Sequence, residues 1–119
     1  MLVNSKTFTT AETMLNANSC KKWLIDQYAK LGVKDEALVA QKHICACSTN
    51  LKETAKFGIQ DENVFGFWDF VGGRFSVWSA IGVVPLSIHF GYDIVSQFLN
   101  GGHAIDKHLL EEKDIRVMD

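Results

Sequence analysis

The chain has 119 residues, of which 47% are hydrophobic and 22% are charged, and its formal net charge is −2. These values lie near the averages for globular proteins, so they predict one domain with a modest core and argue against disorder. The absence of a basic block argues against a nucleic-acid partner, and no stretch has the pattern of a signal peptide or the length of a transmembrane helix. We therefore expect a soluble, cytoplasmic protein without a membrane partner.

Short apolar stretches and helix signals alternate along the first half of the chain. Buried strands are expected at residues 1–3, where the beginning of the strand is missing, and at 43–47 and 63–67. Three helices are expected among these strands, the second of them over residues 34–42. The residues that should start or stop these helices are Thr9 with Glu12 as a capping box, Asp35, Asn50, Gly32 and Gly58. This alternation predicts a parallel α/β sheet.

The second half of the chain is predicted to be mainly helical. Residues 77–91 should form a helix that Pro85 kinks or divides into two shorter ones. Asp93 is expected to cap a last helix with apolar residues at the helical period. The glycine pair at 101–102 weakens that helix in isolation, so it predicts close packing of the backbone against a neighbour. Residues 111–119 are charged and have no predicted fold of their own.

The first segment with candidate chemistry is the sequence Ser-Lys-Thr-Phe-Thr-Thr at residues 5–10. It lies between a predicted strand end and a predicted helix start, where free N–H groups and the helix dipole favour an anion such as phosphate. Hydroxyl groups can donate hydrogen bonds to that anion, and Lys6 adds a positive charge. The composition alone leaves an alternative open, in which Thr9 only caps the helix and the other residues are ordinary loop residues.

The second segment with candidate chemistry surrounds Gly72, Gly73 and Arg74, with aromatic and aliphatic residues on both sides. The double glycine predicts a turn with positive φ and lets the backbone and the guanidinium approach a ligand closely. A fixed cation can stabilise negative charge that develops on oxygen during a reaction, by several kcal/mol. The alternative is an ion pair of Arg74 with Asp69 or Glu62, which contributes about 0–1 kcal/mol when it is exposed.

The remaining chemically active residue types favour structural roles. The three cysteines lack C-x-x-C spacing, which favours reduced thiols over a reactive or metal-binding role, and the four histidines lack the spacing of a metal site. The aromatic residues over 65–78 have only Arg74 among them and so lack regular interleaving with basic residues, which favours core and domain interface over a platform for stacking bases. No metal and no organic cofactor are expected.

Two motifs resemble one known family. Residues 69–82, Asp-Phe-Val-Gly-Gly-Arg-Phe-Ser-Val-Trp-Ser-Ala-Ile-Gly, closely resemble the signature of the glucose-6-phosphate isomerase family. The sequence of residues 5–10, followed by Ala-Glu-Thr, is similar to the segment that this family presents to the sugar phosphate group. The resemblance extends from about Val3 to His108. It implies an α/β parallel-sheet sandwich of the sugar-isomerase (SIS) type, incomplete, with residues 1–119 as a single partial domain.

The resemblance also implies a function and the residues that carry it. The reaction is the interconversion of glucose 6-phosphate and fructose 6-phosphate by a homodimeric enzyme. The residues implied are Ser5, Lys6, Thr7 and Thr10 as phosphate ligands, Arg74 as the group that stabilises the enediolate, and Gly73 beside the substrate. The resemblance further implies that Arg74 shares one cavity with the loop at 5–10.

The family's acid–base residues come from segments without a match here, so we expect the chain alone to be an inactive fragment. One alternative is a non-catalytic, SIS-type regulatory module that binds sugar phosphates. Another is an element for protein–protein association, in which the aromatic stretch is an exposed interface.

Overall fold

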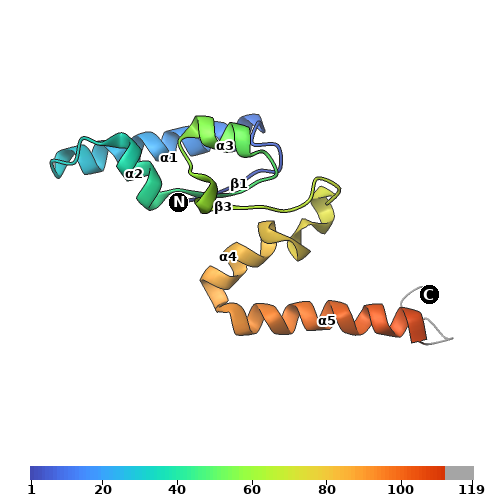
Figure 1. Ribbon diagram of the computed structural model, residues 1–119. Helices are drawn as coiled ribbons and strands as arrows, with labels where there is room; N and C mark the ends of the chain where they lie inside the picture. The colour runs from blue at the N-terminus through green and yellow to red at the C-terminus, as the bar shows by residue number, and fades with distance from the viewer. Residues whose placement is uncertain (112–119) are drawn as a thin grey trace. The chain divides into compact units, whose positions relative to one another are not determined.

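A computed structural model of the chain describes residues 1–111 (Figure 1). The structure contains helices and a parallel sheet, which confirms the predicted mixed α/β class. It divides into two compact units between Val84 and Pro85. The predicted charged tail lies outside the described residues except for Glu111, which is the last residue of a helix.

The sheet of the first unit has three parallel strands in the order β1-β2-β3. The strands are β1 (Leu2–Asn4), β2 (Cys45–Cys47) and β3 (Val64–Phe65). In the register, Val3 lies opposite Ala46, and Ala46 lies opposite Val64. Val3 and Ala46 are buried, as expected for strands of a parallel sheet that packs against helices. Strands β2 and β3 fall within the stretches that the sequence predicts, whereas β1 extends one residue beyond the predicted stretch, to Asn4.

Three helices of the first unit lie on one side of these strands in Figure 1. They are α1 (Ala11–Lys30), α2 (Glu36–His43) and α3 (Leu51–Phe57). The core between the helices and the sheet is formed by Val3, Phe8, Ala17, Ala40, Ile44, Ala46, Phe57 and Ile59. Apolar residues from both layers therefore share one core, as in other α/β proteins.

Most of the predicted helix boundaries are confirmed. The carboxylate of Asp35 accepts a hydrogen bond from the N–H of Leu38 at 3.0 Å. The side chain of Asn50 accepts one from the N–H of Glu53 at 3.2 Å. Helix α3 ends at Gly58, whose φ of 95° lies in the left-handed region that favours glycine. Gly32, with φ of 87°, likewise follows the end of α1.

The predicted cap of α1 was wrong by one residue. The helix begins after Thr10, and within the described residues the Thr10 side chain makes no capping hydrogen bond. The hydroxyl of Thr9 instead donates to the Thr7 hydroxyl at 2.8 Å. The reason is the backbone of Phe8, whose φ of 56° turns the chain before Thr9 and delays the start of the helix.

Pro85 does not divide the helix that contains it, so of the two predicted alternatives, a kink or two shorter helices, the division was wrong. Helix α4 (Ala80–Phe90) continues through Pro85, and a short 3₁₀ helix, η2 (Gly73–Trp78), precedes it. The break falls at Ser79, which has an extended backbone conformation. A helix can accommodate proline when another donor satisfies the carbonyl that proline leaves free. Such a donor is present and is described below.

The junction of η2 and α4 is closely packed. Gly82 is buried, and a Cβ atom added to it would lie 2.2 Å from the carbonyl oxygen of Val77 and 2.6 Å from its Cα. Any side chain at residue 82 would therefore overlap the backbone of η2.

The second unit contains α5 (Tyr92–Glu111). This helix begins one residue after Gly91 (φ 84°) and includes Asp93 in its first turn, so Asp93 is not the cap that the sequence predicts. Left-handed glycine ends α4 and allows α5 to start earlier. At Gly101 an added Cβ would meet nothing within 4 Å among the described residues, so the predicted close packing is absent there. None of the described helices is long and apolar enough to span a membrane.

Candidate functional site

The connection between β1 and α1 is the hydroxyl-rich loop at residues 5–10. The N–H of Ser5 donates to the carbonyl of Cys47 at 3.1 Å, which extends the pairing of β1 with β2. The Ser5 hydroxyl accepts a hydrogen bond from the N–H of Phe8 at 3.1 Å and lies 3.3 Å from the Thr10 hydroxyl. The loop therefore brings together Ser5, which is buried, and Thr10, which is exposed at the start of α1.

Phe8 determines the shape of this loop. Its φ of 56° is uncommon for a residue other than glycine, and its side chain is only 2% exposed. The ring packs edge-on against the ring of Phe57, with 5.7 Å between centroids and an interplanar angle of 78°. The core thus holds Phe8 in a strained backbone conformation, which in turn directs the N–H of Phe8 at the hydroxyl of Ser5.

A second loop, between β2 and α3, is bonded to the first. The hydroxyls of Ser48 and Thr49 both donate to the carbonyl oxygen of Lys6, at 3.0 and 2.9 Å. The side-chain amide of Asn50 donates to the carbonyl of Thr7 at 2.9 Å. We did not predict a role for these residues. Their signal is that polar residues directly follow the carboxyl end of an adjacent parallel strand, where ligand sites commonly form.

An open hollow of about 620 Å³ lies beside these two loops. Its lining residues are Thr7, Thr49, Asn50, Leu51, Phe67, Trp68 and Asp69. Among the predicted phosphate ligands, Thr7 lines this hollow, whereas Ser5, Lys6 and Thr10 are not among its lining residues.

Lys6 connects the first loop to the segment that carries Arg74. Its ammonium donates to the carbonyl oxygen of Val71 at 3.2 Å, although the two residues are 65 positions apart. Lys6 is half-buried, so this hydrogen bond is partly shielded from water. The structure thus brings residue 71, three positions before Arg74, next to the loop at 5–10.

Arg74 is exposed, and its guanidinium lies 5.7 Å from the ring centroid of Phe75. Neither Asp69 nor Glu62 forms an ion pair with it in the described part of the chain, so the alternative of an ion pair is not found. Nor is Arg74 among the residues that line the hollow.

The double glycine does not make the left-handed turn that we predicted. Gly72 has φ of −71° and ψ of 149°, which any residue can adopt, and Gly73 is not among the glycines with positive φ. The turn is made instead by the 3₁₀ helix η2, which begins at Gly73. An added Cβ at Gly73 would meet no described atom within 4 Å, so the space beside it is open to a ligand.

Serine side chains hold η2 together. The hydroxyl of Ser76 donates to the carbonyl of Gly73 at 2.7 Å, and that of Ser79 donates to the carbonyl of Ser76 at 2.7 Å. The Ser79 hydroxyl also accepts from the N–H of Ile81 at 3.3 Å. Successive bonds therefore link Arg74's own turn to the first turn of α4.

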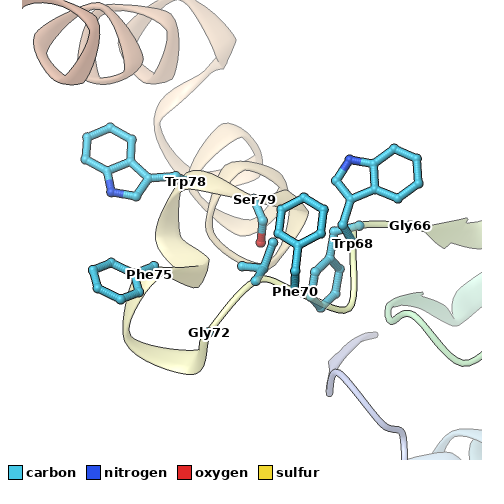
Figure 2. Close-up of a pocket in the computed structure, with 9 residues that line it drawn as sticks. Gly66, Trp68, Phe70, Gly72, Phe75, Trp78 and Ser79 are labelled. Atoms are coloured by element: carbon cyan, nitrogen blue, oxygen red, sulfur yellow. The ribbon is translucent and has the colours of Figure 1, made fainter. Parts of the chain in front are cut away.

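A second cavity, of about 510 Å³, lies within the aromatic segment (Figure 2). It is lined by Gly66, Phe67, Trp68, Phe70, Val71, Gly72, Phe75, Trp78 and Ser79. Figure 2 shows Trp68 and Phe70 close together, and their rings stack with centroids 6.4 Å apart. Trp68 and Phe70 are 71% and 79% exposed, so these two residues lie outside this chain's core, and the predicted core role of the aromatic run was wrong for them.

The three cysteine thiols differ in how deeply they are buried. Cys20 is exposed, whereas Cys47 is buried, and burial together with the neighbouring Cys45 raises the pKa of the Cys47 thiol to about 11. The Cys47 thiol donates to the carbonyl of Ala80 at 3.3 Å. All three cysteines are free, and the described residues contain no cluster of three or more histidine, cysteine or acidic side chains suited to a metal ion.

Together, these features define an α/β protein whose polar loops follow the carboxyl ends of two adjacent parallel strands. The model of the family described as phosphoglucose isomerase matches residues 1–118, and the chain belongs to that family. The resemblance seen in the two sequence motifs is thereby confirmed.

Individual relatives agree with this assignment. The chain is 57% identical over 110 residues to a protein of Plasmodium falciparum named glucose-6-phosphate isomerase, a match that covers 92% of this chain and 18% of that relative. It is 51% identical to cytosolic glucose-6-phosphate isomerase A of Oryza sativa subsp. japonica, over 99% of this chain and 20% of the relative. A cytosolic glucose-6-phosphate isomerase of Zea mays is 50% identical over the same shares. The chain thus spans about a fifth of the length of these curated relatives.

Proposed function

We propose that this chain contributes the phosphate-binding loop and one catalytic arginine to a glucose-6-phosphate isomerase. The substrates would be glucose 6-phosphate and fructose 6-phosphate, and the protein would act in the cytoplasm as part of a homodimer. Family membership and the names of the relatives support this proposal. The SIS-type sandwich, with residues 1–119 as one partial domain of it, is proposed on the same basis.

The proposed phosphate site consists of Ser5, Lys6, Thr7 and Thr10 at the start of α1. Because the Thr10 side chain caps no N–H group within the described residues, the first-turn N–H groups remain available for an anion. The hydroxyls of Ser5 and Thr10 lie 3.3 Å apart and can rotate to donate to it. An ammonium has three donors, so Lys6 can bond Val71 and still contribute charge to a phosphate.

The observation that carries the proposal is the hydrogen bond from Lys6 to Val71, because it joins the loop to the segment of Arg74. Isomerisation through an enediol moves a proton between neighbouring carbons and places negative charge on oxygen. The guanidinium of Arg74 is a cation with several N–H donors and would stabilise that negative charge. Gly73 would lie beside the substrate, since no side chain occupies that space.

Binding of phosphate can be tested on the 119-residue chain by NMR titration with fructose 6-phosphate. The amides of Thr7 and Thr10 should shift first, and Ser5→Ala should weaken the response. Ser19→Ala is the matched control, because Ser19 is exposed on α1, the helix that follows the loop, and its hydroxyl bonds only the carbonyl of Leu15 one turn earlier. A titration without shifts in the loop would contradict the proposed site.

Catalysis can be tested in a chimera. The segment of the Plasmodium falciparum relative that matches this chain is replaced by the chain, and isomerase turnover is measured. The chimera should be active, whereas the chain alone should show no turnover. Arg74→Ala should lower kcat by about 10²–10³-fold, as loss of a preorganised charge partner does in other enzymes. Lys22→Ala is the control, because this lysine is an exposed cation paired with Asp26. A folded chimera without activity would refute the proposal.

A further inference from the structure

Asn4, the last residue of β1, makes a long-range hydrogen bond whose role the proposed chemistry does not explain. Its side-chain amide donates to the carbonyl oxygen of Ile81 at 3.3 Å, across 77 positions of sequence. The other polar atom of the side chain, the carbonyl oxygen Oδ1, is buried and has no hydrogen-bond partner among the described residues. A buried polar atom without a partner lowers stability, so the favourable contribution of Asn4 comes from the hydrogen bond that its side-chain N–H group donates.

The carbonyl that Asn4 bonds is the one that Pro85 leaves without a donor. In an α-helix the carbonyl of residue 81 would accept from the N–H of residue 85. Proline has no N–H, yet α4 continues through this position without a break. The amide of Asn4 therefore replaces the missing backbone donor.

Asn4 and Lys6 hold the two ends of the same segment. Lys6 bonds the carbonyl of Val71, and Asn4 bonds that of Ile81, so residues 71–81 are attached to the strand end at both sides. Ser5 lies between these two residues, and its side chain instead bonds within its own loop, toward Phe8 and Thr10. Alternation of side chains along an extended backbone explains this division.

Residues 71–81 should move together because hydrogen bonds connect the turns within this segment. Ser76 and Ser79 join the turn of Arg74 to the start of α4, and Gly82 allows backbone contact with Val77. A displacement at Ile81 would therefore move the turn that carries Arg74 relative to the loop at 5–10.

We infer that Asn4 is a positioning residue, which supplies the donor that Pro85 lacks and thereby holds the Arg74 segment against the hydroxyl-rich loop. This inference rests on the proposed function of that loop and of Arg74. Asn4 does not itself contact substrate.

The first test is amide hydrogen exchange on the 119-residue chain. Asn4→Ala should accelerate exchange at Gly82 and Val83 by roughly fivefold, the effect of one lost hydrogen bond. Adding Pro85→Ala should restore protection, because alanine provides the N–H. Asn18→Ala is the control, since its amide bonds only Met14 within α1. If Asn4→Ala does not fold but the double variant does, the inference is supported. Unchanged exchange in Asn4→Ala, or a double variant without rescue, would overturn it.

The second test uses the chimera and separates this inference from the proposed function. Asn4→Ala should lower kcat roughly tenfold with KM nearly unchanged, since misplaced catalytic groups reduce the rate more than binding. Pro85→Ala in the same background should return kcat to within about twofold of the parent. An inactive parent chimera would count against the proposed function. An active parent whose Asn4→Ala variant is equally active would count against the positioning role alone.

Discussion

Replacing Gly82 by alanine tests whether the backbone contact between α4 and η2 is as close as the structure shows. The added Cβ would lie 2.2 Å from the carbonyl oxygen of Val77, whereas contacts below 3.0 Å are essentially never observed. The two backbones would have to separate by about 0.8 Å, and overpacking of this kind costs about 3 kcal/mol when the neighbour cannot rotate away. Neither the Val77 carbonyl nor its Cα, 2.6 Å from the added Cβ, is the end of a flexible side chain.

The net effect is smaller than the cost of the clash, because alanine is the better helix former. Alanine is favoured over glycine by about 1 kcal/mol in a helix interior, so we expect Gly82→Ala to lower the free energy of unfolding by about 2 kcal/mol. Gly101→Ala is the matched control. It lies inside α5 with open space among the described residues, so it should raise the free energy of unfolding by up to about 1 kcal/mol.

Urea unfolding, followed by far-UV circular dichroism and tryptophan fluorescence, measures both variants. The difference between them should be about 3 kcal/mol, well beyond the error of extrapolation to water. If Gly82→Ala were as stable as Gly101→Ala, the close approach at the η2–α4 junction would be refuted. A shift at Ile81 would then not be transmitted to the turn of Arg74 through this junction.

Three further predictions concern the cap of α3 and the buried thiol of Cys47. Asn50→Ala removes the side chain that caps α3 and should lower the free energy of unfolding by about 1 kcal/mol in urea titrations. The control is Asn18→Ala, at an exposed position on α1, which should change the free energy of unfolding by less than about 0.5 kcal/mol. Equal effects of the two substitutions would contradict the cap. Because burial raises the pKa of Cys47 to about 11, the folded state keeps its thiol proton where the unfolded state releases it. The free energy of unfolding should therefore fall as the pH rises from about 8.5 to about 11, and Cys47→Ala should remove that contribution. At pH 8, mass spectrometry should find iodoacetamide on exposed Cys20 before Cys47, and the reverse order would refute the burial of Cys47.

Local signals explain why much of the fold could be predicted from the sequence. Asp35 and Asn50 satisfy N–H groups three residues ahead, and Gly58 adopts the left-handed conformation that few other residues tolerate. Each of these choices depends on neighbours within four positions. Where the structure departs from these local signals, distant residues are responsible. Helix α4 continues through Pro85 because Asn4 donates to the carbonyl of Ile81, which Pro85 leaves without a backbone donor. Asn4 and Ile81 are 77 positions apart, so no short stretch of sequence contains both partners of this hydrogen bond.

The same distinction applies to the candidate site. The hydroxyls at residues 5–10 are visible as a composition, so the sequence predicts an anion site there. The bonds from Ser48 and Thr49 to Lys6 join residues more than 40 positions apart, and the bond from Lys6 to Val71 spans 65. The contacts of Ser48 and Thr49 follow from parallel pairing of β1 with β2, which the sequence predicts only as a class of fold. Their individual partners require coordinates.

Because the ring of Phe8 is part of the core, packing in the core helps to determine the geometry of the polar loop at residues 5–10. Because the ring is anchored against Phe57 while its backbone shapes the loop, a change of volume deep in the core should alter how the hydroxyls are presented. The proposed recognition of a sugar phosphate would then change through substitutions that do not contact the ligand. Engineering of this loop should accordingly begin with the packing beneath it.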